Sequence, residues 1–348
     1  MEDLDTLVLR TAQGWQAAGL PVVLVTVART WGSSPRPPGS LMAINSRGET
    51  VGSVSGGCIE DDLIHRIREG GVQAACATGT PAVLRYGISA DEAHRFGLPC
   101  GGTVALVLEL VSRHSRLDEL LLACQQRRST ERTLDLRTGR VELFEGRRDG
   151  VPQLSDSHLT TYLGPQARLI LIGAGDLARF MCQMALSLGF EVIVCDPREE
   201  HRASWQMDGV LLSHEMPDDL ILRLRPDART AVVALTHDPK LDDLALIDAL
   251  QSEAFYVGAI GSRRNSAQRR ERLHTHFDLP ESALQGLHGP AGLYIGSKTP
   301  AEIALSIMAE VVAVKNGIPL SAPVPVAAGK SRLEPAGQQA LTAPACAV

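Results

Sequence analysis

The sequence predicts an α/β protein in which a carboxy-terminal Rossmann-type domain with a parallel sheet accompanies a smaller amino-terminal α/β domain. Three observations lead to this prediction. The chain has 348 residues, too many for one ordinary hydrophobic core. From Arg168 onward, apolar segments of strand length alternate with segments of helix length, which indicates right-handed crossovers and a parallel sheet. A glycine turn, Gly173-Ala174-Gly175, joins the first of these strands to a helix.

The amino-terminal domain is expected to occupy residues 1–128. Leu4 to Ala18 has the pattern of an amphipathic helix, and an apolar strand follows at Pro21–Ala28. Strands are also expected at Leu41–Asn45, near Val51 and at Thr103–Leu110, with helices at about Ile59–Glu69 and Leu117–Gln126. Three turns rich in glycine, with serine, proline or cysteine, separate these elements, at residues 31–40, 52–60 and 98–102.

Residues 129–165 are polar, arginine-rich and turn-rich, with an expected hairpin around Gly139, and we interpret them as the inter-domain connection. The Rossmann-type domain is expected at residues 166–320. Its predicted strands are Arg168–Ile172, Glu191–Cys195, Thr230–Leu235 and Phe255–Val257, and its helices are 176–188, 240–251 and 263–275.

A last helix is predicted from a complete set of start signals. Thr299 is the expected N-cap, Pro300 takes the first helical position, and Glu302 completes a capping box. The run to Lys315 is mostly apolar and should be buried. Residues 321–348, rich in alanine, proline and glycine, predict a disordered tail.

Composition and charge exclude several classes of protein. The hydrophobic content of 44% and charged content of 21% are those of a soluble globular protein. A net charge of -6 argues against a nucleic-acid binder. No apolar run approaches the roughly 18 residues of a membrane span. Met1 to Asp5 is acidic where a signal peptide would be basic, so we expect a cytoplasmic protein.

The seven cysteines are scattered, and none forms a C-x-x-C pair. The sequence also has no H-E-x-x-H motif. A zinc ribbon, a thioredoxin-type site and a zincin-type site are therefore excluded. Most of these thiols are expected to be small buried hydrophobic groups.

The turn at Gly173 is a G-x-G-x-x-A version of the dinucleotide fingerprint. Gly173 allows the tight turn, Gly175 lets the backbone approach a phosphate, and Ala178 lets the helix pack on the strand. Asp196 ends the next strand, where a carboxylate that binds a ribose hydroxyl is expected. Asp176, at the start of the helix, complements the helix dipole but repels an anionic ligand.

Further candidates follow later strands of the Rossmann-type domain, at the carboxyl edge where ligands bind. His237 follows one strand, and it is either a ligand-binding residue or an ordinary loop histidine. Ser262 and Arg263 follow another strand and could reach an anion, while most of the arginine-rich helix after them should be solvated. A positioned acid or base for hydride transfer is not evident.

Two cysteines stand out in the amino-terminal domain. Cys58 follows Gly56 and Gly57 at a helix start, where backbone N–H groups stabilise a thiolate, although the acidic residues after it oppose this. Cys100 precedes two glycines, which allows a large group to approach. Both are candidates for chemistry or for structural burial. Three such turns in one domain suggest a shared pocket.

These motifs resemble those of the XdhC/CoxI family over about residues 5–320. The amino-terminal matches are Gly32-Ser33-Ser34-Pro35-Arg36 with Gly39 and Met42, Gly52 to Glu60, and Cys100-Gly101-Gly102. The Rossmann-domain matches are the Gly173 turn, Asp196-Pro197-Arg198, Thr236-His237-Asp238, Tyr256 to Ser262 and Thr299 to Ala304. Asp176 departs from the histidine that many members have.

The resemblance implies an accessory protein for xanthine dehydrogenase and related molybdenum hydroxylases. Such a protein binds the molybdenum cofactor, as molybdopterin or a dinucleotide form, helps to exchange an oxo for a sulfido ligand, and delivers the cofactor to the apo-enzyme. A cysteine desulfurase would supply the sulfur. Cys58 would contact molybdenum or carry sulfur, and Arg36 would pair with a phosphate. An NAD(P)-dependent oxidoreductase and a nucleotide-sensing regulator are the alternatives, and a homodimer is left open.

Overall fold

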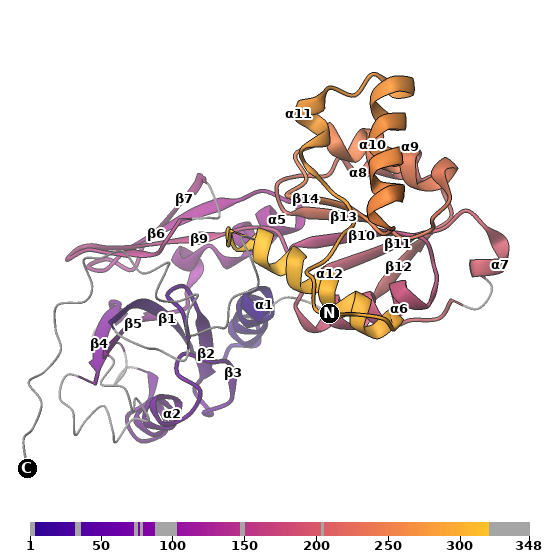
Figure 1. Cartoon of the computed structure of the whole chain (residues 1–348). Helices are drawn as coiled ribbons and strands as arrows, with labels where there is room; N and C mark the ends of the chain where they lie inside the picture. The colour runs from indigo at the N-terminus through magenta and orange to yellow at the C-terminus, as the bar shows by residue number, and fades with distance from the viewer. Residues whose placement is uncertain are drawn as a thin grey trace, which may run out of the picture. The chain divides into compact units, whose positions relative to one another are not determined.

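The computed structural model describes residues 4–31, 36–72, 76, 79–87, 103–146, 150–202 and 205–319, without the side chains of Cys58 and Arg202. The described residues form two compact units. The first unit contains those up to Ala167 together with Leu186–Glu191, and the second contains Arg168–Ala185 and those from Val192 onward. Each unit combines helices with its own sheets, and the second contains a parallel sheet (Figure 1). The predicted fold class is confirmed.

A five-stranded antiparallel sheet forms the centre of the first unit. Its strand order is β3-β2-β1-β5-β4, with β1 (Val22–Trp31), β2 (Leu41–Asn45), β3 (Thr50–Gly52), β4 (Ala82–Tyr86) and β5 (Thr103–Leu110). Alternate residues of β1 enter two different cores, because successive side chains of a strand point to opposite faces. Val23 and Val25 face one core, and Val22 and Leu24 face the other.

Helices bury both faces of this sheet. Helices α1 (Leu4–Ala17) and α5 (Leu117–Gln125) contribute to the core on one face, and α2 (Cys58–Gly70) contributes Ile59, Leu63 and Ile67 to the core on the other. The sequence predicted all three helices. It did not predict β4, an edge strand in which Tyr86 alone is fully buried.

The predicted inter-domain connection at residues 129–165 is wrong. This segment contains a four-stranded antiparallel sheet of order β7-β6-β9-β8, made of β6 (Thr130–Asp135), β7 (Val141–Glu145), β8 (Gln153–Leu154) and β9 (His158–Leu163). The expected hairpin at Gly139 does join β6 to β7. The buried side chains of β6 include the polar Thr130 and Arg132, so the sequence of this strand lacks a clear alternation of apolar and polar residues. Arg132 is buried because it pairs with the buried Glu109.

The second unit contains a six-stranded sheet of order β12-β11-β10-β13-β14-β15. Its strands are β10 (Arg168–Ile172), β11 (Glu191–Cys195), β12 (Val210–Ser213), β13 (Thr230–Ala234), β14 (Tyr256–Ala259) and β15 (Leu287–His288), and those with a described register are parallel. This is the Rossmann strand order, which reverses beside β10. The carboxyl ends of β10 and β13 therefore flank the place where such folds bind ligands.

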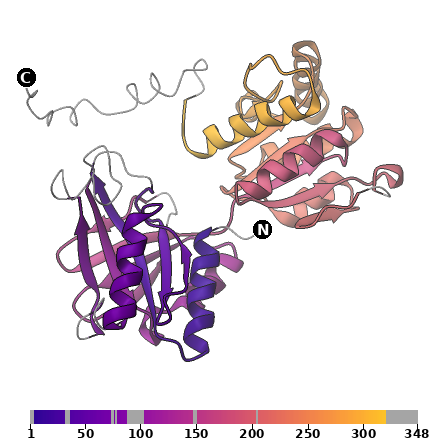
Figure 2. The same ribbon diagram turned by 90° about the horizontal axis from the view of Figure 1, so that it is seen from below.

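Helices cover both faces of the parallel sheet. The helices of this unit are α6 (Asp176–Ser187), α7 (Glu199–Arg202), α8 (Pro217–Leu224), α9 (Pro239–Leu250), α10 (Arg263–Phe277), α11 (Glu281–Leu284) and α12 (Pro300–Lys315). Helices α6 and α12 lie on one face, and α8, α9 and α10 lie on the other (Figure 1 and Figure 2). Strand β12 and helix α8 were not predicted.

The predicted start of the last helix is confirmed. Thr299 accepts a hydrogen bond from the backbone N–H of Glu302, whose side chain completes the capping box. One face of α12 is buried as expected, although Leu305 on another face is 53% exposed. The predicted tail, 321–348, lies outside the described residues. In the part of the chain that is described, no helix combines the length and apolarity needed to cross a membrane.

Candidate functional site

The glycine turn after β10 has the geometry that its sequence predicts. Gly173 has φ of 111°, and its N–H donates to the carbonyl of Cys195 at 2.8 Å. A Cβ on Gly173 would lie 2.9 Å from Cγ2 of Thr236. Gly175 is exposed, and a Cβ there would have no atom within 4 Å. Gly173 is therefore required by the fold, whereas Gly175 leaves open space at the start of α6.

Asp196 braces this turn from the end of β11. Its buried carboxylate accepts hydrogen bonds from the N–H of Ala174 at 2.8 Å and from the backbone N–H of Arg198 at 3.1 Å. The guanidinium of Arg198 adds two more, at 2.9 and 2.8 Å. Burial alone would raise the pKa of Asp196, but these hydrogen bonds outweigh it and lower the pKa.

The arrangement of Asp196 differs from the one expected for a ribose-binding carboxylate. Both of its oxygens are engaged within the protein, so they are not presented to a ligand. The partly accessible group at this position is Arg198, whose side chain is 28% exposed. The sequence pattern located the carboxylate correctly but did not reveal its arginine partner two residues later.

The loop after β13 holds His237 in a left-handed conformation, with φ of 63°. This conformation is uncommon for a residue other than glycine and requires support from its surroundings. The support comes from Asp242, which accepts hydrogen bonds from the N–H of His237 at 3.1 Å and the hydroxyl of Thr236 at 2.7 Å. The neighbouring Asp238 caps α9. His237 itself is exposed at the carboxyl edge.

A buried ionic cluster lies behind this edge. Arg269 of α10 pairs with Asp242 at 2.9 Å and Asp243 at 3.0 Å, and it also donates to the carbonyl of Ile260. Arg272 completes the cluster by pairing with Asp243 at 2.8 Å. The expectation that the arginine-rich face of α10 is mostly solvated is wrong for Arg269, because two buried carboxylates require its charge.

The remaining Rossmann-domain candidates lie at the start of α10. The Ser262 hydroxyl caps this helix by accepting the N–H of Asn265 at 3.1 Å. Arg263 occupies the first helical position and is exposed. Ser262 thus has a structural role as a cap, and Arg263 is accessible to an anion.

In the first unit, the loop before α2 is organised around Glu60. The carboxylate of Glu60 accepts the backbone N–H groups of four successive residues at 2.8–2.9 Å and two serine hydroxyls. The donors are Val54, Ser55, Gly56 and Gly57 through their N–H groups, and Ser53 and Ser55 through their hydroxyls. Burial alone would raise the pKa of Glu60, but these bonds lower it from 4.5 to about 2.

Glu60 should therefore control the stability of this loop. We expect Glu60→Gln to lower the free energy of unfolding by on the order of 2 kcal/mol at pH 7, because an amide N–H₂ would face the backbone donors. The pKa of Glu60 in the folded protein lies below the ordinary value of 4.5 that applies to the unfolded chain. The stability that the Glu60 carboxylate adds is therefore present above pH 4.5 and is lost as the pH falls toward 2. Chemical denaturation across this range checks both points.

The matched control is Asp61→Asn, because Asp61 is exposed on the next position of α2. It should leave the unfolding free energy within about 0.5 kcal/mol of wild type. Equal stability of Glu60→Gln and wild type at pH 7 would contradict the role assigned to Glu60.

The structure brings two predicted loops of the first unit together. The Nε of Arg36 donates to the carbonyl of Ser53 at 3.2 Å, which places the first loop beside the second. Gly56 and Gly57 are exposed, and a Cβ on either would meet no atom within 4 Å. Cys58 is the first residue of α2. Its side chain and the whole of Cys100 lie outside the described residues.

Three of the other described cysteines fit the expectation of structural burial, whereas Cys124 is only partly buried. Burial raises the pKa of Cys76 to about 11 and those of Cys182 and Cys195 to about 12. Such thiols are protonated and unreactive at neutral pH. Within the described ranges, no three side chains of histidine, cysteine, aspartate or glutamate gather in a way that could hold a metal ion.

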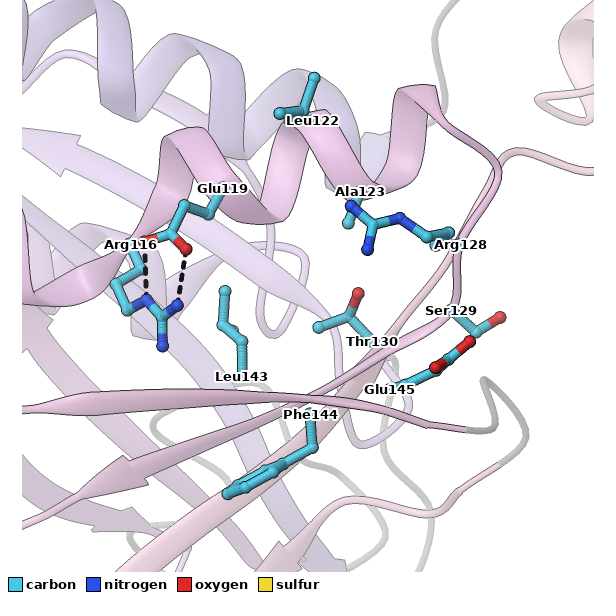
Figure 3. A pocket seen from close by; sticks show the side chains of 10 residues that line it. All are labelled: Arg116, Glu119, Leu122, Ala123, Arg128, Ser129, Thr130, Leu143, Phe144 and Glu145. Atoms are coloured by element: carbon cyan, nitrogen blue, oxygen red, sulfur yellow. Dashed lines mark hydrogen bonds and ion pairs between the residues drawn. The ribbon is translucent and has the colours of Figure 1, made fainter.

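A separate hollow of about 250 Å³ lies in the first unit, between α5 and the β6–β7 hairpin. Figure 3 shows the Arg116–Glu119 ion pair at one end of it and Phe144 below. Ten residues line it, and none of the predicted site residues is among them. The hollow is therefore distinct from the candidate site.

Two segments of the chain match models of known protein families. Residues 15–87 match the model described as the XdhC and CoxI family, and residues 169–311 match the XdhC Rossmann domain. The chain belongs to the XdhC and CoxI family. The two matches include the candidate loops at Arg36 and Gly56–Gly57 and every Rossmann-domain candidate.

Several known proteins resemble the chain over most of its length. A Bacillus subtilis protein, named as a probable subunit of xanthine dehydrogenase, is 24% identical over 85% of this chain and 94% of its own length. The Escherichia coli molybdenum cofactor insertion chaperone PaoD is 26% identical over 90% of each chain. A Bacillus halodurans crystal structure described as a xanthine dehydrogenase has a TM-score of 0.72 and 25% identity, and it covers 93% of this chain and 98% of its own.

Proposed function

We propose that the chain is an accessory protein that binds the molybdenum cofactor, supports its sulfuration and delivers it to a xanthine dehydrogenase-type molybdenum hydroxylase. The open glycine turn at Gly175 is the observation that carries the proposal, because it suits a phosphate-bearing cofactor. Membership of the XdhC and CoxI family supports the accessory role. The relative named as a molybdenum cofactor insertion chaperone supports the choice of cargo.

The residues of the Rossmann unit fit the phosphate-bearing end of such a cofactor. Molybdopterin carries a terminal phosphate, and its dinucleotide forms carry a pyrophosphate. Gly175 is exposed with open space where a side chain would be, so a phosphate can approach the backbone. Gly173 shapes the turn, while His237 and Arg263 are exposed on neighbouring loops of the same edge.

The amino-terminal loops suit the binding of molybdenum and the handling of sulfur. A thiolate is a suitable ligand for molybdenum and a suitable carrier of sulfur, and Cys58 begins a helix whose preceding glycines are exposed. Because Glu60 already accepts the N–H groups of this loop, its negative charge is offset locally. Cys100 is the second proposed sulfur-handling residue, and Arg36 is proposed to pair with a phosphate. When bound, the cofactor supplies the molybdenum centre that the hydroxylase requires.

The geometry at Asp196 argues against a simple NAD-dependent oxidoreductase. Recognition of the ribose diol of NAD uses a carboxylate with accessible oxygens, and those of Asp196 are taken by Ala174 and Arg198. Tight NAD(P) binding with substrate turnover would support the oxidoreductase alternative. Ligand binding without any hydroxylase partner would support a nucleotide-sensing regulator.

The proposed setting of this accessory protein is the cytoplasm, and its proposed sulfur donor is a cysteine desulfurase. A homodimer is compatible with this proposal.

The direct test is the production of a xanthine dehydrogenase-type hydroxylase in cells with and without this protein. We expect the hydroxylase from deficient cells to contain less sulfurated cofactor and to show correspondingly lower activity. Release of the cyanolysable sulfur measures sulfuration independently of turnover. Fully sulfurated, active hydroxylase from the deficient cells would refute the proposal.

A substitution at Cys58 tests its proposed role. We expect Cys58→Ala to lower cofactor retention or hydroxylase sulfuration, because the thiolate contact is lost, while the far-ultraviolet circular dichroism stays unchanged. Cys124→Ala is the matched control, since this partly exposed thiol lies on α5. Activation of the hydroxylase by Cys58→Ala at the wild-type level would assign Cys58 a structural role.

A further inference from the structure

A buried cluster around Glu310 lies in the second unit, and the proposed function assigns it no role. Glu310 of α12 is 8% exposed, and its Oε2 accepts the hydroxyl of Tyr256 at 2.6 Å and the N–H of Gly292 at 2.6 Å. Its Oε1 lies 3.1 Å from Nδ1 of His288. One carboxylate thus connects α12, β14, β15 and the loop between β15 and α12.

His288 is placed at the carboxyl edge of the parallel sheet. It is the last residue of β15 and lies opposite Gly258 of β14 in parallel register. Its ring stacks on Tyr256, with centroids 4.3 Å apart and an angle of 23° between the planes. A Cβ on Gly258 would come within 2.6 Å of the Tyr256 ring, so glycine is required for this stack.

The protonation states in the cluster determine which nitrogen of His288 is available. Burial raises the pKa of Tyr256 far above its usual range, so its phenol keeps its proton and donates to Glu310. Burial alone would raise the pKa of Glu310, but the hydrogen bonds from His288, Tyr256 and Gly292 lower it, so Glu310 is a carboxylate. A carboxylate can only accept, and therefore Nδ1 of His288 carries a hydrogen and donates.

The other nitrogen of His288 is left as a proton acceptor. With hydrogen on Nδ1, the neutral ring has a lone pair on Nε2. The side chain is 27% exposed, and Nε2 has no hydrogen-bond partner among the residues that the structure describes. A histidine oriented by a carboxylate through Nδ1, with an accessible Nε2, is the arrangement of a general base.

We propose that His288, oriented by Glu310, is an acid–base residue that exchanges a proton with the ligand bound at the carboxyl edge. Strands β14 and β15 lie on the opposite side of β10 from β11. They therefore underlie the half of an extended ligand that points away from Asp196. The function of the chain would then include proton transfer as well as binding and delivery.

The chemical step is a reversible proton transfer. The Nε2 lone pair takes a proton from an O–H, N–H or S–H group of the ligand, whose bond electrons stay on the ligand. The imidazolium that forms is stabilised by Glu310, and the reverse transfer returns the proton. No oxidant or reductant is needed. The identity of the ligand rests on the proposed function, whereas the reactivity of His288 does not.

The first test is the carbethoxylation of the full chain by diethyl pyrocarbonate, followed by mass spectrometry of its peptides. We expect His288 to react several-fold faster than His276, although His276 is exposed on α10. The reason is that Glu310 holds the ring of His288 with Nε2 as the nucleophilic nitrogen. Glu310→Gln should slow the reaction of His288 several-fold and leave His276 unchanged. Reaction of His288 no faster than His276 would overturn the proposal.

A measurement on the wild-type chain covers the case in which Glu310→Gln does not fold. Nitrogen-15 spectra of histidine-labelled protein, assigned through His288→Gln, report which ring nitrogen carries hydrogen. The proposal requires the Nδ1–H tautomer of the neutral ring at His288. The Nε2–H tautomer at His288 would overturn it.

The final test separates acid–base chemistry from a structural role. His288→Gln should keep the wild-type pterin and molybdenum content but slow the activation of apo-hydroxylase by about tenfold or more. Unchanged activation by His288→Gln would overturn the proposal. A wild-type chain that carries no pterin would instead refute the proposed function, and the diethyl pyrocarbonate and nitrogen-15 results would still decide the role of His288.

Discussion

Gly173→Ala is expected to destabilise the Rossmann unit by about 2–4 kcal/mol. The residue has φ of 111°, a backbone conformation that side chains other than glycine rarely adopt. The added Cβ would also lie 2.9 Å from Cγ2 of Thr236 and 3.5 Å from the backbone of Leu235, so the loop after β13 would have to move. Chemical denaturation of the full chain measures the loss.

Gly175→Ala is the matched control, two residues further along the same turn. A Cβ there meets no atom within 4 Å, and the residue is exposed. We expect its unfolding free energy to stay within about 1 kcal/mol of wild type, while its bound cofactor content falls because the methyl group blocks the approach of a phosphate. Wild-type stability of Gly173→Ala would contradict the backbone structure described for the turn. Wild-type cofactor content of Gly175→Ala would contradict the role of the turn in binding a phosphate.

Arg269→Leu should have a larger effect, about 3–5 kcal/mol, since it leaves Asp242 without its ionic partner and Asp243 with only Arg272. Burial already raises the pKa of Asp242, and the hydrogen bond from Thr236 and the charge of Arg269 oppose this. Without Arg269, mildly acidic buffer should reduce the loss, because a protonated carboxyl is less costly to bury. Denaturation at two pH values measures the effect.

Arg264→Ala provides the comparison within the same helix. Arg264 is exposed near the start of α10, so its loss should change the unfolding free energy by no more than about 0.5 kcal/mol. Hydrogen exchange should show faster exchange at Thr236 and His237 in Arg269→Leu only, because Asp242 holds their N–H groups. Equal stability of the two variants would show that the buried pairs contribute little.

The features that the sequence predicted well are those determined by neighbouring residues. The turn at Gly173 follows an uninterrupted apolar strand, and the start of α12 is set by Thr299 and Glu302 acting across three positions. Local hydrogen bonds and backbone preferences decide such features, so a single sequence contains the information.

The features that the sequence did not predict depend on partners far along the chain. Arg132 is buried in a strand because it pairs with Glu109 of another strand, so the sequence of β6 to β9 lacks the apolar alternation that indicates a sheet. Arg269 is buried because two carboxylates of α9 require it. His288 gains its orientation from Glu310, on another element. Polar pairs of this kind leave no periodic signal.

The candidate site contains features that the sequence predicted and features that it did not predict. The sequence located Asp196, yet its oxygens serve Ala174 and Arg198, so its expected contact with a ribose is replaced by support of the turn. It noted Glu60 only as a negative charge near Cys58, whereas Glu60 binds the N–H groups of the whole loop. A carboxylate three residues after two glycines at a helix start is the signal that could have indicated this capping role.

The measurement that tests the central claim most directly is the analysis of the full chain purified under anaerobic conditions. Its metal content is determined by elemental analysis, and its pterin content by oxidation to a fluorescent derivative. The account predicts molybdenum together with a phosphate-bearing pterin, and a lower content of both in Gly175→Ala. A chain that retains NAD(P) and carries no pterin would contradict it.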